Sequence, residues 1–205
     1  MSRFYIPLDK ITGTKILPDF SPITSIGDGG LNGAFQNCTG LTSVSFPNLT
    51  TIGYSGLQYA FRNCTGLTGS VFFPSLTSVG YFGLSGTFQG CTGLTGSVSF
   101  PSLITIDDYG LYYAFNGCTG LTGSISFPNL TSVSDYGLYY AFRNCTGLTS
   151  VSFPNLTTIN SNGLYYAFQN CTGITEVHFK SSLSGNSQCT ASYMGCTNAT
   201  VYFDL

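Results

Sequence analysis

The sequence predicts a solenoid, an elongated domain of similar coils that stack on one another, and three observations lead to this prediction. The phrase Cys-Thr-Gly-Leu-Thr recurs at steps of 26, 27, 27 and 27 residues, and once more after 26 residues as Cys-Thr-Gly-Ile-Thr; such a period is typical of solenoids. Apolar and aromatic residues recur with the same period, and so do the prolines and glycines that end strands and form turns. The phrase begins at Cys38, Cys64, Cys91, Cys118, Cys145 and Cys171.

The first half of each coil predicts two short extended segments. In the coil from 38 to 63, Val44 and Phe46 alternate with serines, as in a strand with one buried face. Pro47 ends this strand because proline has no backbone N–H to donate. Leu49 and Ile52 then form the second extended segment.

The second half of each coil predicts a short helix. Leu57, Ala60 and Phe61 have the i, i+3, i+4 spacing of one apolar helix face. Polar residues precede this segment, where a side-chain oxygen caps a helix by accepting an unpaired backbone N–H. The carboxylates of Asp108 and Asp135 also suit Ca²⁺, which takes oxygen ligands, but capping is the interpretation that we favour. The cap candidates are Ser55, Asp108, Asp135 and Asn162, with Asp28 at the same place in an earlier coil.

Stacking the coils predicts two columns of touching phenylalanines. Neighbouring strands lie about 4.7–4.9 Å apart, so equivalent side chains in successive coils touch. A fully buried phenylalanine contributes roughly 1.5–3 kcal/mol through its burial, and a single coil has no second layer against which to bury it. One column contains Phe46, Phe73, Phe100, Phe127, Phe153 and Phe179, and the other contains Phe35, Phe61, Phe88, Phe115, Phe142 and Phe168.

The unbroken repeat predicts one solenoid domain over residues 1–205. Residues 1–37 form an N-terminal partial coil, in which Lys15-Ile16-Leu17-Pro18 resembles a strand and its stop. Residues 38–180 form the repeated coils. Residues 181–205 lose the proline and the Gly-Leu-x-x-Ala-Phe segment but regain a strand at Thr200-Val201-Tyr202-Phe203, so we expect a C-terminal cap.

The composition excludes several classes of partner. Charged residues make up only 7% of the chain, against about 25% in an average soluble protein. With six Lys plus Arg and a net charge of −2, the chain has no basic patch for nucleic acid. No apolar run approaches the roughly 20 residues that span a bilayer, so we expect no membrane insertion.

The first ten residues lack the apolar stretch and small-residue cleavage site of a secretory signal. Three explanations remain open: the protein is not exported by that route, the given sequence omits a leader, or the chain belongs to something that lysis releases, such as a virus particle. We expect a place at the cell surface, outside the cell or in a virion.

The pattern Ala-Phe-x-x-Cys-x-x-Leu-x-x-Val-x-Phe-Pro resembles the BspA-like leucine-rich repeats, which occur on bacterial surface proteins, in some protists and in phage-derived genes. The resemblance covers residues 15–203 over six successive coils. It implies a leucine-rich-repeat solenoid that is right-handed, with one strand of a concave parallel sheet and a short helix in each repeat of 26–27 residues. It also implies a role in adhesion or recognition, and it implies no catalytic residue and no cofactor.

The six equivalent cysteines form a column, which Cys196 extends, and Cys189 is additional. Stacked side chains point in parallel, which suits disulfide geometry badly, and a linear column does not converge on a tetrahedral metal. We therefore expect buried free thiols that pack as small apolar side chains. If any disulfide exists, Cys189 with Cys196 is the candidate.

Three sets of residues are candidates for binding. Tyr112, Tyr139 and Tyr165 form one tyrosine column, and Tyr113, Tyr140 and Tyr166 form its neighbour, with Tyr59. Because the buried positions are already filled, at least one column should be partly exposed and offer rigid contact area to a protein or a sugar. The alternative is a stacking ladder that only completes the coil edge.

The other two sets lie on the outward positions of the strand sheet. Phe72 is an apolar residue among serines, and Glu176 and His178 share one face at the C-terminal end. We expect a solvated histidine rather than a general base, because no nucleophile is marked out beside it. The two side chains are placed to share a hydrogen bond.

The sequence therefore predicts a non-enzymatic recognition module that binds a protein or carbohydrate ligand through its repeated surface. The alternative is a structural component of a phage virion or another assembly, in which the C-terminal edge strand pairs with another chain, including a second copy of this one. An enzyme is disfavoured because the repeat concentrates no acids, bases or metal ligands in one place.

Overall fold

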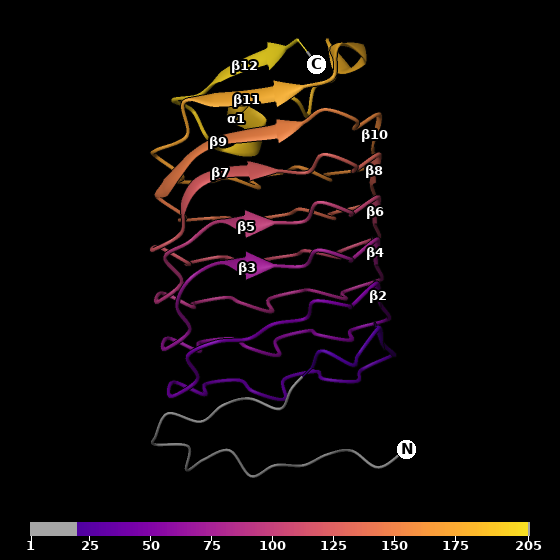
Figure 1. The fold of residues 1–205 in the computed structure, drawn as a ribbon. Helices are drawn as coiled ribbons and strands as arrows, with labels where there is room; N and C mark the ends of the chain where they lie inside the picture. The colour runs from indigo at the N-terminus through magenta and orange to yellow at the C-terminus, as the bar shows by residue number, and fades with distance from the viewer. Residues whose placement is uncertain (1–19, 205) are drawn as a thin grey trace.

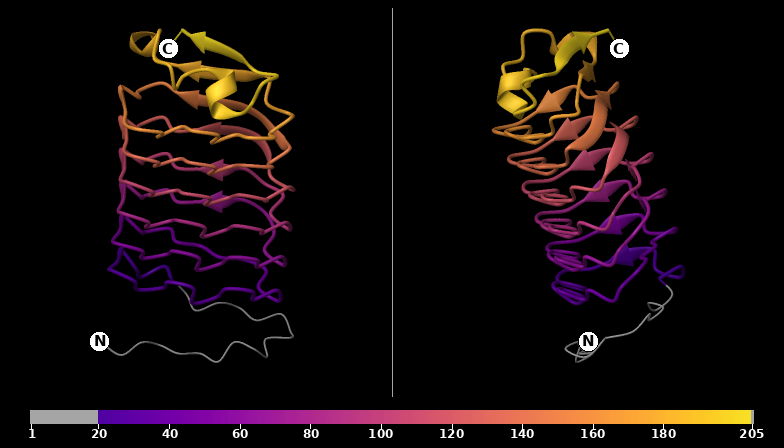
Figure 2. Two further views of the ribbon diagram at one scale, coloured as in Figure 1. Left: turned by 180° about the vertical axis from the view of Figure 1, so that it is seen from behind. Right: turned by 90° about the vertical axis from the view of Figure 1, so that its left-hand side faces the viewer.

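The computed structural model describes residues 20–204, which form a right-handed coil that rises from the N-terminal to the C-terminal end (Figure 1). The central coils each contribute a strand to a front sheet and a strand to a side sheet, and then return along a third face without regular strands (Figures 1 and 2). The fold is therefore the leucine-rich-repeat solenoid that the sequence predicts. The expected strand at Lys15-Ile16-Leu17-Pro18 lies outside the described residues.

The front sheet is parallel and its strands follow the order β12-β11-β9-β7-β5-β3. From β3 to β11, one valine or isoleucine of each strand points into the core, as the alternation predicts, and Val177 pairs with Val151 in the preceding coil. In the first full coil, residues 44–46 lie at the equivalent place but form no regular strand. The strands are β3 (Val71–Phe72), β5 (Val98–Ser99), β7 (Thr122–Ser126), β9 (Gly147–Phe153), β11 (Glu176–Phe179) and β12 (Thr200–Phe203).

The side sheet is also parallel, in the order β1-β2-β4-β6-β8-β10. It is built from the second extended segment, and its apolar residue is buried from Ile26 through Val133. The strands are β1 (Ser25–Ile26), β2 (Thr51–Ile52), β4 (Ser78–Val79), β6 (Thr105–Ile106), β8 (Ser132–Val133) and β10 (Thr158–Ile159).

Coils of 27 and of 26 residues stack on one another, and the extra residue of the longer coil is accommodated in the front sheet. The longer coils have an extra glycine before the strand, such as Gly123, which has φ +79°. Where β7 of a longer coil pairs with β9 of a shorter one, the register shifts between Gly123 and Ser124. This β-bulge keeps the inward residues Ile125 and Val151 paired.

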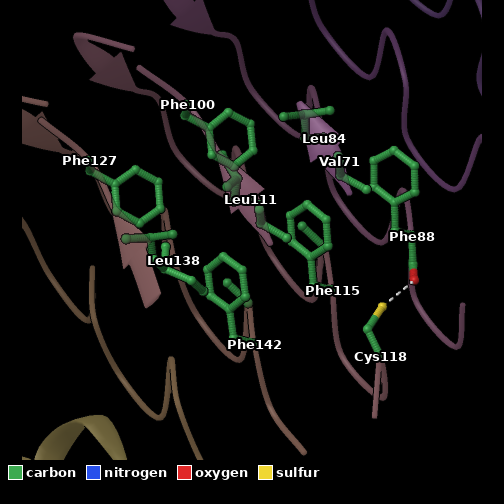
Figure 3. Close-up of a cluster of buried hydrophobic side chains, with 14 of the residues drawn as sticks. Val71, Leu84, Phe88, Phe100, Leu111, Phe115, Cys118, Phe127, Leu138 and Phe142 are labelled. Atoms are coloured by element: carbon green, nitrogen blue, oxygen red, sulfur yellow. Dashed lines mark hydrogen bonds between the residues drawn. The ribbon is translucent and has the colours of Figure 1, made fainter. Parts of the chain in front are cut away.

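Both predicted phenylalanine columns are confirmed, and they run side by side through the core. Centroids of successive rings in the column of Phe46 are 5.2–5.8 Å apart from Phe46 to Phe179. In the column of Phe35 they are 5.1–5.6 Å apart. The two columns touch at an angle, as between Phe100 and Phe115 at 6.3 Å (Figure 3). The core is therefore continuous from coil to coil.

The expected helix does not form in the repeated coils. Residues 55–62 and their equivalents are successive turns, and the described residues contain a single α-helix, α1 (Ala191–Met194), in the C-terminal segment. We call the surface made by residues 55–62, 82–89, 109–116, 136–143 and 162–169 the turn face; the left view of Figure 2 looks onto it. The expectation was right about which residues are buried, since Leu57, Ala60 and Phe61 all are.

The close stacking of coils explains why turns replace the helix. An α-helix with its side chains is about 10–12 Å wide, whereas strands of neighbouring coils are about 4.8 Å apart. On the turn face, every second N–H donates to the next coil, as from Tyr113 to the carbonyl of Tyr139 at 3.0 Å. The N–H groups between them bond within the coil, as from Ala114 to the carbonyl of Leu111 at 3.0 Å. Flat turns therefore satisfy the backbone at a spacing that helices cannot reach.

The expected helix caps consequently have another role. Oδ1 of Asp108 accepts the backbone N–H of Asp135 at 3.1 Å, and Oδ1 of Asp135 accepts that of Ser161 at 3.0 Å. Asp28 accepts the N–H of Tyr54 in the same way, at 2.9 Å. Each carboxylate thus joins its coil to the next one.

The cysteine column consists of buried free thiols, as expected. The thiol of Cys118 donates to the carbonyl of Phe88 in the preceding coil at 3.0 Å (Figure 3), and Cys64, Cys91 and Cys171 make equivalent bonds. Burial raises the pKa of the Cys118 thiol to about 12. Cys189 and Cys196, the candidate pair for a disulfide, are both free and buried.

The C-terminal segment covers the last coil on the turn face. After η1 (Ser181–Leu183), helix α1 is capped by the side chain of Thr190, which accepts the N–H of Tyr193 at 3.2 Å. The carbonyls of Tyr193 and Met194 accept N–H groups of Tyr166 and Phe168, both at 2.9 Å. In the front sheet, β12 pairs with β11 and forms the edge.

Candidate functional site: an aromatic surface on the turn face

Three columns of aromatic rings cover the turn face, and the coils at 109–116 and 136–143 contribute a ring to all three. In the first column the ring centroids of Phe82, Tyr109 and Tyr136 are 4.8 and 5.0 Å apart. The other two columns are those predicted from sequence. Ring centroids are 5.3 and 5.5 Å apart along Tyr112, Tyr139 and Tyr165. They are 5.0 and 5.6 Å apart along Tyr113, Tyr140 and Tyr166. We call this surface the tyrosine face; it consists of Phe82, Tyr109, Tyr136, Tyr112, Tyr139, Tyr165, Tyr59, Tyr113, Tyr140 and Tyr166, with Tyr193 at its C-terminal end.

The columns also contact one another within each coil. The rings of Tyr139 and Tyr140 meet at 4.4 Å and 85°, and Tyr136 meets Tyr139 at 5.5 Å and 61°. The pKa of Tyr139 is raised, chiefly by burial, and the adjoining Tyr140 phenol adds to the shift. The tyrosines are half-buried. They form one surface of phenol rings in mutual contact.

Two of the three columns occupy backbone positions that favour glycine. Tyr59, Tyr113, Tyr140 and Tyr166 have φ between +49° and +55°, and equivalent positions in other coils are Gly33 and Gly86, at +62° and +58°. A side chain in this left-handed region costs roughly 1–2 kcal/mol. A stacked aromatic pair contributes about 0.5–1.5 kcal/mol beyond the burial of its surface, which is similar in size to this strain. Tyrosine at these positions therefore carries a backbone cost that glycine, as at Gly33 and Gly86, does not.

The turn-face segment at 82–89 carries no tyrosine. It has Ser85 and Gly86 in place of two tyrosines, and both are buried. The ring of Tyr59 lies over Gly86, where an added Cβ would collide with it. The hydroxyl of Ser85 is fully buried and has no hydrogen-bond partner. The neighbouring rings thus close over the gap.

Two arginines border the tyrosine face. The guanidinium carbon of Arg62 lies 5.5 Å from the ring centroid of Tyr59, and that of Arg143 lies 5.2 Å from that of Tyr140. These are cation–π distances. Within residues 20–204, neither arginine has a carboxylate oxygen within 4.0 Å, and the Nε atom of each is buried without a hydrogen-bond partner. Among the described residues, neither cation therefore has an anionic partner.

Sequence reasoning missed part of this surface. Tyr109 and Tyr136 are 27 residues apart, so the repeat alone could have predicted that they stack. The expected helix gave no reason to place them on the same surface as the other tyrosine columns. The surface also continues at the coil corner through Tyr54 and Tyr81, which stack at 5.4 Å and are 55% and 39% exposed. The arginines recur 81 residues apart, a signal that we did not use.

The remaining candidates lie on the front sheet, away from the tyrosine face. Phe72 in β3 is 53% exposed, as expected, and is flanked by Ser99 of the next coil. Glu176 and His178 are both on β11, four coils further along. The structure therefore brings the six tyrosines together, but it does not bring Phe72, Glu176 and His178 to them.

His178 belongs to a small cluster at the end of the front sheet. Its Nε2 lies 3.5 Å from a carboxylate oxygen of Glu176, and its Nδ1 lies 3.0 Å from Oδ1 of Asp204. Its ring stacks on Tyr202 at 4.8 Å. The pKa of His178 is raised, chiefly by the hydrogen bond with Asp204. Asp204 and Tyr202 were not predicted, because nothing in the sequence shows that β12 returns beside β11.

The described residues offer little else for chemistry. Among residues 20–204, no group of three or more His, Cys, Asp or Glu side chains is placed to hold a metal ion. In the same range, no helix is long and apolar enough to cross a membrane.

The stacked coils and their repeated faces define a solenoid repeat protein. Residues 17–112 and 57–200 match the BspA type leucine rich repeat region, with six copies of the repeat. The chain therefore belongs to the BspA type leucine-rich repeat family. Membership of this family indicates a module for protein interaction or adhesion, and it specifies no partner.

Two solved structures show similarity at low identity. One is a leucine-rich repeat protein from Bacteroides ovatus, at 20% identity and a TM-score of 0.41, over 88% of this chain and 54% of that one. The other is a leucine rich cell surface protein from Faecalibacterium prausnitzii, at 16% identity and a TM-score of 0.23, over 96% and 86%. This chain thus spans about half the length of the Bacteroides ovatus protein. The search of curated proteins gave no match.

Proposed function

We propose that this protein is a non-enzymatic recognition or adhesion module that binds a protein or glycan through the tyrosine face. The observation that carries the proposal is the placement of tyrosine where the backbone favours glycine. Strained residues persist where the surroundings hold them, and they concentrate at functional sites. The same chain has Gly33 and Gly86 at equivalent positions, so the coil itself accepts glycine there.

The composition of the surface also supports binding. Tyrosine and arginine are enriched among the residues that dominate protein interfaces. The rings are held by one another, so little side-chain entropy is lost when a partner binds. In contrast, the outward positions of the front sheet are mostly serines, which specify little.

A direct test compares two double variants on a glycan array and a protein array. Tyr139→Ser with Tyr165→Ser removes two of the three rings of one column, and both rings are half-buried. Tyr202→Ser with Phe72→Ser makes comparable changes on the front sheet, where both side chains are exposed. The proposal expects the first variant to lose the partners that wild type retains and the second to keep them. Equal retention by both variants would rule out the tyrosine face.

We propose a place at the cell surface or in a virion, outside the reducing cytoplasm. The family assignment supports this proposal. All eight cysteines are free and buried, and burial raises the pKa of the thiols, for example that of Cys196 to about 11. Thiols that stay protonated react slowly, so these thiols are compatible with an oxidising environment.

A second candidate function is a structural role in a larger assembly, which the edge of the front sheet favours. Within residues 20–204, no strand pairs with the outer side of β12, and an open edge is a template for pairing with another chain. Analytical ultracentrifugation distinguishes the two functions: self-association that Val201→Pro abolishes supports assembly, and a monomer at all concentrations contradicts it.

A further inference from the structure

The tyrosine face offers ring edges and hydroxyl groups rather than open ring faces. The ring of Tyr139 is stacked between Tyr112 at 5.3 Å and Tyr165 at 5.5 Å. Tyr140 is likewise stacked between Tyr113 at 5.0 Å and Tyr166 at 5.6 Å. A sugar packs its C–H groups against the negative face of an aromatic ring. In the middle of these columns both faces are already covered.

Ring edges and phenol hydroxyls suit a partner that is rich in oxygen acceptors. The edge of an aromatic ring carries partial positive charge. The pKa values of Tyr112 and Tyr113 are raised, mainly by burial, so the phenols stay protonated and able to donate. Backbone carbonyls and carboxylates complement such a surface.

The two arginines add a charge pattern with a defined spacing. Arg62 and Arg143 occupy the same position three coils apart, and Gln89 and Asn116 occupy it between them. Three coil spacings of about 4.8 Å correspond to about 14 Å. Neither guanidinium has a carboxylate partner within the described part of the chain. Two unpaired cations therefore border an otherwise uncharged aromatic surface.

We propose that the partner of the tyrosine face is a protein, and that it places an extended segment along the coil axis with two carboxylates about 14 Å apart, one for each of Arg62 and Arg143. An extended strand advances about 3.3 Å per residue, so carboxylates four residues apart are separated by about 13 Å and match the two arginines. The proposal rests on the function proposed above and adds the chemical class of the partner.

The test uses fluorescent threonine-rich peptides that each carry two glutamates, separated by two, four or six residues. Anisotropy measures their affinity for the full chain. The four-residue spacing should bind most tightly. The double variant Arg62→Gln, Arg143→Gln should weaken that peptide about tenfold, as expected for lost charge-assisted hydrogen bonds, and should remove the preference for spacing.

Matched variants separate charge from folding. Arg62→Lys with Arg143→Lys keeps both charges and should retain the spacing preference. Lys180→Gln removes a cation on another face and should change nothing. Circular dichroism of each variant should match wild type, because the arginines lie at the edge of the turn face.

Three results would overturn the proposal: no peptide binds, all spacings bind equally, or binding is indifferent to the arginines. Retention of neutral glycans that depends on Tyr139 but not on the arginines would also overturn it, while leaving the proposed function intact. The proposed function fails separately, when Tyr139→Ser with Tyr165→Ser retains every ligand that wild type retains.

Discussion

The strain in the tyrosine columns can be measured by comparing glycine with alanine at two neighbouring positions. Tyr140 has φ +52°, whereas Tyr139, beside it in the same coil, is not among the residues with positive φ. Replacing either residue with glycine or alanine removes the same phenol ring. The difference between the two replacements therefore reports the backbone alone.

The expected signs are opposite at the two positions. At Tyr140, glycine should be more stable than alanine by about 1–2 kcal/mol, because alanine keeps the Cβ that the left-handed conformation disfavours. At Tyr139, alanine should be more stable by about 0.5–1 kcal/mol, because glycine gains more freedom in the unfolded chain. The double difference is about 2 kcal/mol, which chemical unfolding in urea resolves.

The assay is the free energy of unfolding of all four variants, followed by tyrosine fluorescence and by circular dichroism. Agreement between the two signals checks that unfolding is cooperative, which is needed for a repeat protein. If Tyr140→Ala is as stable as Tyr140→Gly, the backbone at this position is not strained. The argument that a side chain at this position costs more backbone free energy than glycine would then be refuted.

Three further predictions concern the core, the thiols and the histidine cluster. Phe115→Ala should cost about 3–5 kcal/mol in the free energy of unfolding, because its ring is fully buried between Phe88 at 5.3 Å and Phe142 at 5.1 Å; a loss below about 1 kcal/mol would contradict the close stacking of rings. Since burial raises the pKa of the Cys118 thiol to about 12, a thiol reagent at pH 8 should label it only when the chain unfolds, and rapid labelling of folded protein would show that the column is open. The pKa of His178 is raised in the folded state, so its stabilising contribution is complete below about pH 6.5 and is lost as the pH rises through the folded pKa. Wild type should therefore lose stability relative to His178→Gln as the pH rises above about 6.5, and parallel pH profiles would show that the contacts with Glu176 and Asp204 contribute nothing.

Much of the fold follows from the local pattern, and the core columns show why. In a solenoid each coil packs against copies of itself, so a side chain that is inward in one coil is inward in all of them. Phe46 and Phe61 could be assigned to the core from their recurrence alone. The buried thiol at Cys118 follows for the same reason.

The turn face could not be derived in this way. The spacing of Leu57, Ala60 and Phe61 fits a helix and fits the observed turns equally well, because both place these residues inward. The choice depends on the distance to the next coil, and no single repeat contains that information. As a result, Asp108 and Asp135 were interpreted as helix caps, although they bind backbone N–H groups of the next coil.

The same distinction between local pattern and tertiary structure applies to the candidate site. The period alone determined that this chain is a solenoid, which residues form its core, and that tyrosines would lie in columns. Only the tertiary structure decided that the ring faces cover one another, that two arginines border them with no carboxylate partner within residues 20–204, and that Asp204 returns to His178. The physical reason is that a repeat specifies which residues become neighbours, whereas the orientation of each side chain depends on backbone angles and on coils that lie 26 or more residues away.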